Sequence, residues 1–478
     1  MCYTDFRMTL NKSLAQNTIV QIIGKAVSTI LGLIAVAILT RNLGTEQFGW
    51  YVTATGFLQF VGILIDFGFT VTTSNLLSEP EHDKEQLFNT IFTWRFITAT
   101  ICFILAPLIF LFFPYRNEIK IAVAVTSLSF FANTINQVFI GFYRQKLSMF
   151  IATMSEVIGR VLLVIGFAIL ALNKAGFIPL MLIITLSSLG STYYLIKNFG
   201  KIKFSIDKVI SRAIFHKMWP TAISVIFNTL YLQADRVILP LYVSQSEVGL
   251  YGAAYRVLDI TTQIAAIVMG LVMPLLTFAW SRKLLDEFKK RYQIGVDLLA
   301  LILFPMVTGI FVLAGPIMNF IAGSEFSGSG AMLRWLCISI LGTTFGMTFG
   351  HVVLAINRQK EALLIYGSDA ILSVTGYLIF IPKYGWLGAV WVTIFSEIYA
   401  GIFLALMAVV YSGIMPKFGT LAKILLSSII MGTIIFTVSW PLIPSILLGI
   451  LVYTALIFLF KIIKLQSLKE IINFSKVA

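Results

Sequence analysis

Long apolar runs separated by short polar segments recur along almost the whole chain. A helix that crosses a bilayer needs about 20 predominantly apolar residues, and fourteen runs approach or exceed that length. They lie at residues 17–40, 49–71, 89–113, 119–142, 150–172, 177–197, 217–243, 250–280, 291–314, 331–356, 362–381, 385–411, 421–440 and 442–463. The pattern predicts an all-α, polytopic membrane protein with 14 transmembrane helices.

The composition agrees with this prediction. Charged residues make up 12% of the 478 positions and hydrophobic residues 58%, whereas about 25% of the residues in a soluble domain are charged. The first apolar run ends in Ala35-Val36-Ala37, which resembles a signal-peptidase site. Because that run is too long for the apolar core of a signal peptide and many similar runs follow, we expect it to be retained as the first span.

The basic residues are distributed unevenly between the two sides of the predicted membrane. With the N-terminus in the cytoplasm, 24 of the 35 Lys and Arg residues fall on inner segments, 6 on outer loops and 5 inside spans. Cytoplasmic loops of membrane proteins carry such an excess. We therefore expect a multi-pass protein of the cytoplasmic (inner) membrane with both termini cytoplasmic, surrounded by membrane lipids. These basic segments account for the net charge of +14, so we expect no nucleic-acid partner.

A short basic motif occurs twice at equivalent places. Arg144-Gln145-Lys146 joins the fourth and fifth predicted spans, and Arg358-Gln359-Lys360 joins the tenth and eleventh. Shifting the sequence by 200 residues gives a second match, with six identities in a window of 21 that includes Gly49 on Gly249 and Tyr51 on Tyr251. Chance would give about two. Both matches map each span onto the span six places later.

An even number of spans per repeat gives the two halves the same orientation in the membrane. The sequence thus predicts two six-helix lobes related as a parallel pseudo-repeat, plus two extra C-terminal helices, which is a common transporter plan. We place the lobes at 1–205 and 206–411 and the additional spans and tail at 412–478. The basic stretch Lys197–Lys217 is the expected hinge, and a cleft between the lobes is the expected place for a substrate.

Ionisable residues inside the predicted spans are the candidate functional residues, since each costs about 2.5–3.5 kcal/mol to insert and normally faces a cavity, a partner or the interface. The basic ones, expected to form a cationic substrate cavity, are Lys25, Arg95, Arg160, Arg236 and Arg256. The acidic ones, expected to act in gating or ion coupling, are Asp66, Glu156, Asp259, Asp369 and Glu397. Asp235 is a further acid at membrane depth.

Several of these residues also have simpler explanations. Glu156 and Arg160 are spaced i, i+4, and Arg256 and Asp259 i, i+3, so each pair can neutralise itself on one helix face. Four of the five basic residues, all except Arg160, lie near a span end, from which their long side chains can reach the head groups. Asp66 can pair with Lys25 or Arg95, either as a gate latch that breaks on opening or as a fixed structural bridge.

Four segments carry a family resemblance: ILTRNLGTEQFGWY (Ile38–Tyr51), IDFGF (Ile65–Phe69), GPIMNFIAGSEFSGSGAMLRWL (Gly315–Leu336) and PKYGWLGAVWVTIFSE (Pro382–Glu397). On the basis of these segments, the chain resembles the Wzx-type polysaccharide-biosynthesis flippases of the multidrug/oligosaccharidyl-lipid/polysaccharide exporter superfamily. The resemblance covers essentially the whole chain. The resemblance implies movement of undecaprenyl-pyrophosphate-linked oligosaccharide, such as an O-antigen repeat unit, to the outer leaflet by alternating access. It also implies polysaccharide polymerase and glycosyltransferases as partners.

The deep charges fit that implication. A pyrophosphate presents planar oxygen arrays, which the fork of an arginine guanidinium matches in a bidentate manner. A deep carboxylate such as Glu397 can take a proton or bind Na⁺, so the coupling ion is expected to be Na⁺ or H⁺. The three Cys and three His residues show no metal-ligand spacing, and no cofactor-binding motif is present.

Two other functions within the same superfamily remain open, a Na⁺- or H⁺-coupled multidrug or metabolite exporter and a lipid II flippase. The predicted 14 spans and the excess of deep cations favour the oligosaccharide flippase, because cationic drugs require an acidic cleft. A membrane enzyme such as a glycosyltransferase would need a sizeable outer loop or a catalytic acid motif, and the sequence has neither. We therefore expect a transporter without enzymatic activity.

Overall fold

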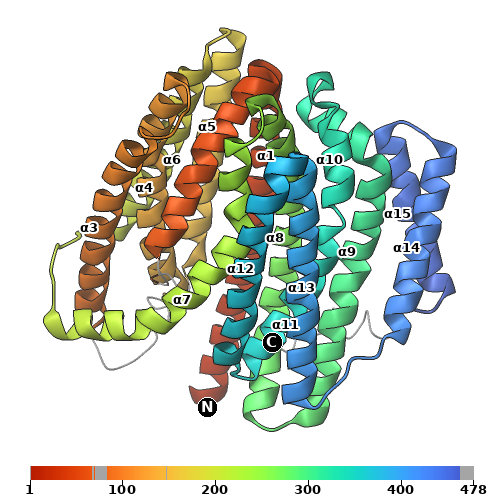
Figure 1. Cartoon of the computed structure of the whole chain (residues 1–478). Coiled ribbons are helices and arrows are strands. Elements are labelled where there is room, and N and C mark those ends of the chain that lie inside the picture. Colours follow the sequence, from red (N-terminus) through yellow and green to blue (C-terminus); the bar gives the residue numbers. More distant parts are fainter. Residues whose placement is uncertain (1, 67–68, 70–82, 147, 463–478) are drawn as a thin grey trace. The chain divides into compact units, whose positions relative to one another are not determined.

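The computed structural model describes residues 2–66, 69, 83–146 and 148–462, and within these ranges every regular element is a helix (Figure 1). The chain divides into two compact units, residues 1–229 and 230–477. Each is described by itself below. The lobe boundaries at 205 and 411 stay predictions.

Unit 1 begins with a helix too long for a single span. At 1.5 Å per residue, the 65 residues of α1 (Cys2–Asp66) would reach about 98 Å, roughly three times the thickness of a bilayer core. Gly44 interrupts it with a φ of 67° and a ψ of −177°, a conformation that costs a glycine little because it has no Cβ. The break separates the predicted spans 17–40 and 49–71. The end of the second span and residues 67–68 of the IDFGF motif lie outside the described residues.

The remaining helices of unit 1 match the predicted spans closely, except at the last. They are α3 (Lys84–Phe110), α4 (Asn117–Gln145), α5 (Met149–Leu172), α6 (Phe177–Phe199) and the first part of α7 (Lys208–Ile238). Residues 208–217 of the predicted hinge Lys197–Lys217 are therefore helical and not a loop, and the hinge role itself stays a prediction. The Oδ1 atom of Asp207 caps this helix by accepting from the backbone N–H of Val209 at 2.8 Å and of Ile210 at 2.9 Å.

Unit 2 holds the end of α7 and the helices that follow it. These are η1 (Leu239–Leu241), α8 (Gln245–Ser281), α9 (Leu285–Ala322), η2 (Ser324–Phe326), α10 (Ser329–Leu336), α11 (Ser339–Ala355), α12 (Gln359–Tyr384), α13 (Trp386–Ser412), α14 (Gly419–Val438) and α15 (Leu442–Leu459). The predicted span 331–356 is divided by a turn at Cys337 and Ile338. Ser244 begins α8 with a capping box that also uses Glu247.

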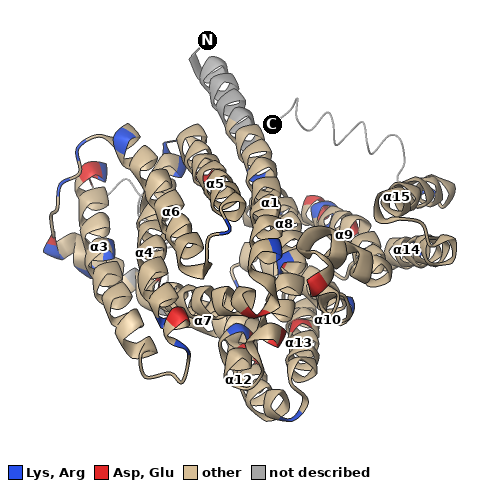
Figure 2. Cartoon of the chain, turned by 90° about the horizontal axis from the view of Figure 1, so that it is seen from above, with Lys and Arg blue, Asp and Glu red and all other residues tan. Residues whose placement is uncertain are grey.

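The helices account for the predicted span count. In the described part of the chain, 12 helices are long and apolar enough to cross a membrane, with the two parts of α1 counted as one and α7 not included. Dividing α1 at Gly44 and adding the 31-residue α7 gives the predicted 14. Figure 2 shows few charged residues along the helical ribbons. Large side chains such as Leu451 of α15, 67% exposed, require hydrocarbon rather than water around them. The all-α membrane fold is confirmed.

Helix boundaries also agree with the predicted repeat. Gly44, where α1 breaks, is offset by 200 residues from Ser244, the N-cap of α8. The two basic motifs occupy the junctions between α4 and α5 and between α11 and α12. Equivalent sequence positions thus begin and end helices at equivalent places in the two halves.

Candidate functional site

Arg95 and Asp66 form a buried ion pair in unit 1. The Nη2 atom of Arg95 donates to Oδ1 of Asp66 at 2.6 Å, and the side chain of Arg95 is only 3% exposed. Its Nη1 also donates to the carbonyl oxygen of Ile65 at 3.1 Å, and its Nε to that of Thr134 at 3.5 Å. Of the two partners expected for Asp66, the structure selects Arg95. This guanidinium neither reaches the head groups nor offers its charge to a ligand in this conformation.

Lys25 and Glu156 form a second, more exposed pair between α1 and α5. Lys25 Nζ lies 3.3 Å from Glu156 Oε1, with side-chain exposures of 39% and 41%. The expected pair of Glu156 with Arg160 on the same helix face is not formed. The two helices approach closely because Gly24 of α1 has no side chain: a Cβ there would lie 1.8 Å from Cγ2 of Thr153. Lys25 is thereby brought within reach of Glu156.

Arg160 is left exposed one turn further along α5. Its Nη1 would lie 3.9 Å from a Cβ added at Gly32, so the guanidinium lies beside α1. Among the described residues it has neither an ion-pair partner nor a hydrogen-bond acceptor. Arg160 is thus a cation at membrane depth with its donors available.

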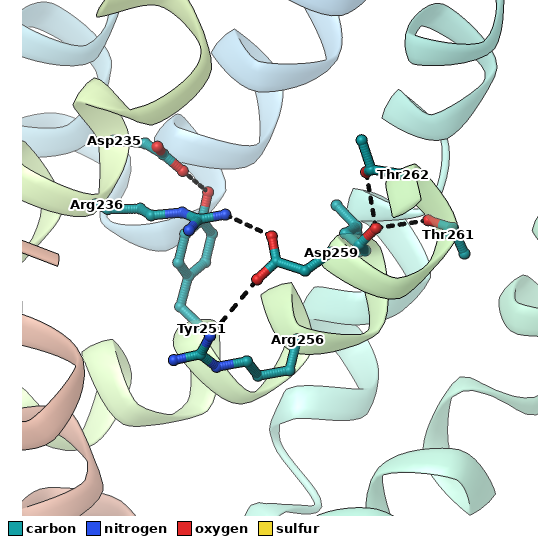
Figure 3. A network of polar contacts seen from close by, with 8 residues as sticks. Asp235, Arg236, Tyr251, Arg256, Asp259, Thr261 and Thr262 are labelled. Carbon is teal, nitrogen blue, oxygen red and sulfur yellow. Dashed lines mark hydrogen bonds and ion pairs between the residues drawn. The ribbon is translucent and has the colours of Figure 1, made fainter. Parts of the chain in front are cut away.

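Unit 2 contains a polar network between the end of α7 and α8 (Figure 3). Arg236 Nη2 donates to Asp259 Oδ1 at 2.8 Å, and Arg256 Nη1 lies 3.7 Å from Asp259 Oδ2. One carboxylate is therefore shared by two guanidinium groups. The predicted i, i+3 pair of Arg256 and Asp259 is confirmed, but Arg236 makes the shorter contact with the same acid. The guanidinium of Arg236 also lies over the ring of Tyr255, 4.5 Å from its centroid.

Asp235, next to Arg236 on α7, belongs to an acidic cluster with Asp369 and Glu397, in which the two aspartates are buried and Glu397 is partly exposed. Asp235 is 0% exposed, and its Oδ2 accepts from the Tyr251 hydroxyl at 2.8 Å. Asp369 of α12 is equally buried and accepts from Ser373 Oγ at 3.1 Å. Glu397 of α13 lies near both aspartates and near the Thr343 hydroxyl. Three acidic side chains from three helices therefore lie near one another inside unit 2.

Two carboxylate oxygens of the acidic cluster lack hydrogen bonds to the residues that the structure describes. Asp235 Oδ1 and Asp369 Oδ2 are buried and have no hydrogen-bond partner among the described residues. A buried oxygen left in that state costs about 1–3 kcal/mol, which a proton or a cation would relieve. In the described part of the chain, no three His, Cys, Asp or Glu side chains are placed to hold a metal ion by themselves. A bound cation would therefore also need hydroxyl or carbonyl oxygens.

The sequence matches the family model described as "Polysaccharide biosynthesis protein" over residues 14–280, which is more than half of the chain. The chain belongs to this family. Two curated relatives have names that refer to glycan biosynthesis or O-antigen transport. It is 23% identical over 474 residues to the "Probable low-salt glycan biosynthesis flippase Agl15" of Haloferax volcanii, covering 96% of this chain and 99% of that protein. It is 23% identical over 402 residues to the "Putative O-antigen transporter" of Shigella flexneri, covering 79% and 93%.

The fold of this polysaccharide biosynthesis protein resembles that of a solved flippase. The lipid II flippase MurJ, in an inward closed conformation, matches with a TM-score of 0.78 and 18% identity, covering 92% of this chain and 98% of MurJ. At that identity the similarity concerns the fold.

In this family member, the deep charges were largely identifiable from sequence, but their partners were not. The charge pattern led us to Asp66, Glu156, Asp259, Asp369 and Glu397 and to the five cations. We did not place Asp235 among the site residues, although it lies at membrane depth, because its neighbours Tyr251 and Asp369 come from other helices. Only the fold brings them together.

Proposed function

We propose that the protein moves an undecaprenyl-pyrophosphate-linked oligosaccharide from the inner to the outer leaflet of the cytoplasmic membrane by alternating access. Similarity to a glycan biosynthesis flippase over 96% of the chain is the observation that carries this proposal. Membership of the polysaccharide biosynthesis family over residues 14–280 supports it. The protein is a transporter and has no enzymatic role.

The basic group on α1 and α5 is suited to the pyrophosphate. Arg160 has its donors available, and Lys25 is half-exposed and held by one acid at 3.3 Å. An anionic head group that approaches Arg160 would meet a fork of N–H donors that stays charged at any depth. Arg256 in unit 2 is a second candidate, because its side chain is 32% exposed. Arg95 is assigned a structural role.

The acidic cluster is suited to energy coupling. Asp235, Asp369 and Glu397 lie inside the membrane-spanning part of unit 2, where an uncompensated carboxylate is costly. We assign to them the binding of the coupling ion, Na⁺ or H⁺. Because Asp235 is adjacent to Arg236, which donates to Asp259, a change at the cluster can reach the network that contains Arg256.

The proposed function also includes a cellular location and protein partners. The excess of basic residues on inner segments supports a cytoplasmic-membrane location with both termini in the cytoplasm. Glycosyltransferases that assemble the cargo and a polymerase that consumes it are the proposed partners.

The test is a flipping assay with the purified full chain in proteoliposomes. Lipid-linked oligosaccharide carrying a radioactive sugar is placed in both leaflets, and added glycosidase reports the fraction that becomes accessible. We expect the protein to make the protected pool accessible and the Arg160→Ala variant to be much slower. An unchanged protected pool with wild-type protein, under both Na⁺ and proton gradients, would refute the proposal.

A further inference from the structure

The segment from Lys197 to Trp219, at the junction of α6 and α7, is strongly basic. It contains six Lys or Arg residues and a single acid, Asp207. Hydrophobic residues alternate with these charges throughout. None of the candidate site residues lies in this segment.

One face of the first turns of α7 is fixed to the core of unit 1. Ile210, Ile214 and Met218 are 4%, 1% and 5% exposed and pack in a cluster with residues such as Phe88 and Phe139. Their spacing of four residues places them on one side of the helix. This helix therefore has a buried face and an opposite, outer face.

Polar contacts with α3 hold the same segment in place. Trp94 Nε1 donates to Ser211 Oγ at 2.8 Å, and Gln86 Nε2 donates to Asp207 Oδ2 at 3.0 Å. The backbone N–H of Ser205 donates to Thr93 Oγ1 at 3.1 Å. The outer face is thus ordered by the protein itself, and a ligand that binds it need not meet the entropic cost of ordering it.

The outer face combines apolar and basic side chains. Val209 is 72% exposed and Trp219 60%, and both lie on the same side as the exposed residues Lys208 and Arg212. Lys208 and Arg212 have no ion-pair partner among the described residues, whereas nearby Lys203 is engaged by Glu85 at 3.5 Å. Large apolar residues beside unpaired cations are typical of a helix that lies in the membrane interface.

The orientation of the segment agrees with such a position. In Figure 1 the first turns of α7 run across the lower ends of the unit 1 helices, at a steep angle to α3 and α4. The same helix then continues to Ile238. Because it leads into the predicted span 217–243 and lies across the ends of its neighbours, we expect this segment at head-group depth.

We propose that the outer face of Lys208–Trp219 binds the head groups of anionic phospholipids in the leaflet that it faces. Lys208 and Arg212 contact the phosphate groups, and Val209 and Trp219 insert among the upper parts of the acyl chains. The apolar residues distinguish this surface from a site for a soluble anion, which would have no use for them. The binding goes beyond the transport activity, and it acts on the helix whose other end carries Asp235 and Arg236.

The proposal is tested by lipid binding to the purified full chain. Detergent-solubilised protein is titrated with phosphatidylglycerol or phosphatidylcholine, and bound lipids are counted by native mass spectrometry. Each basic side chain near an anionic surface contributes roughly fivefold in affinity. We therefore expect the Lys208→Gln/Arg212→Gln variant to bind phosphatidylglycerol about twenty- to thirtyfold more weakly than wild type, with phosphatidylcholine unchanged.

Two control variants make the result specific. Lys174→Gln/Lys383→Gln removes the same charge from two other exposed residues, one in the turn after α5 and one in the last turn of α12, and should bind phosphatidylglycerol as wild type does. Lys208→Arg/Arg212→Lys keeps the charge and should retain binding, which excludes a folding defect as the cause. Equal phosphatidylglycerol affinity of wild type and Lys208→Gln/Arg212→Gln would overturn the proposal, as would complete displacement of the lipid by inorganic phosphate. Neither outcome would affect the flipping assay.

Discussion

Arg236 and Asp259 join α7 to α8 through a hydrogen bond of 2.8 Å between Nη2 and Oδ1. The side chains are 17% and 32% exposed, so the pair is largely shielded from solvent. Arg236 has Asp235 as its neighbour in sequence, and Asp259 also faces Arg256 at 3.7 Å. Arg236 therefore connects Asp235 of the acidic cluster with Asp259 and, through Asp259, with Arg256.

The Asp259→Asn variant should be less stable than wild type. It removes the acceptor of Arg236 and leaves that guanidinium partly buried without its counter-charge, at a cost of about 1–3 kcal/mol. The measurement is the thermal unfolding midpoint of the protein in detergent. Arg236→Gln should cost a similar amount, and the Asp259→Asn/Arg236→Gln double variant should lose less than the sum of the two. Strict additivity would show that the two residues do not interact.

Truncation to alanine should affect the stability of the protein strongly at Arg95 and hardly at all at Arg160. Arg95→Ala breaks a pair in which the arginine side chain is 3% exposed and leaves Asp66 without its cation, so we expect a loss of about 3–5 kcal/mol in the free energy of unfolding. Arg160→Ala removes a side chain with no partner among the described residues and should change stability by no more than about 0.5 kcal/mol.

Transport should depend on the charge and the shape of the Arg160 side chain. Arg160→Ala should abolish surface polysaccharide or slow flipping at normal expression, and Arg160→Lys should keep partial activity because it preserves the charge without the bidentate fork. Expression is checked by immunoblot in each case. Full activity of both Arg160 variants would remove Arg160 from cargo handling.

Features that are local in the sequence, such as the helices, could be predicted, whereas contacts between residues on different helices could not. The apolar runs predicted the helices because a span is a local feature, and Gly44 fell between two of them. The start of α7 was missed because its basic residues suggested a loop, while the buried positions Ile210, Ile214 and Met218 are recognisable only at helical spacing. The pairing of Lys25 with Glu156 depends on how closely α1 approaches α5 at Gly24. No sequence pattern on one helix contains that information.

Gly342 should tolerate no side chain. A Cβ at this position of α11 would lie 2.5 Å from the backbone carbon of Glu397 and 2.6 Å from the nitrogen of Ile398 on α13. Backbone atoms cannot rotate away, so α11 and α13 would have to separate beside a member of the acidic cluster. We expect Gly342→Ala to destabilise the protein by about 1–3 kcal/mol and to impair transport.

Gly309 provides the matched control for that substitution. It lies inside α9, and nothing is within 4 Å of the Cβ that alanine would add. Gly309→Ala should therefore be neutral or stabilise the protein by about 0.5–1 kcal/mol, because alanine has the higher helix propensity. If thermal midpoints show Gly342→Ala to be as stable as Gly309→Ala, the close approach of α11 to α13 is incorrect.

The identity of the coupling ion can be determined from stability before any transport is measured. A ligand that binds only the folded protein raises its stability, by about 2.7 kcal/mol at one hundred times the dissociation constant. If Na⁺ binds at the acidic cluster, the unfolding midpoint should rise with Na⁺ but not with K⁺ at equal ionic strength. If the ion is H⁺, Na⁺ and K⁺ should act alike and the midpoint should depend on pH.

Variants of the buried acids assign the effect to the cluster. Asp235→Asn and Asp369→Asn each remove a carboxylate that is 0% exposed and carries an oxygen without a hydrogen-bond partner among the described residues, so each should abolish the dependence on the coupling ion. Asp297→Asn is the control, because Asp297 on α9 accepts from Gln293 at 2.9 Å and is not part of the cluster. Since an amide keeps the shape of the carboxylate but not its charge, the cluster variants should still fold. Ion dependence that survives in both, or disappears equally in Asp297→Asn, would place the coupling site elsewhere.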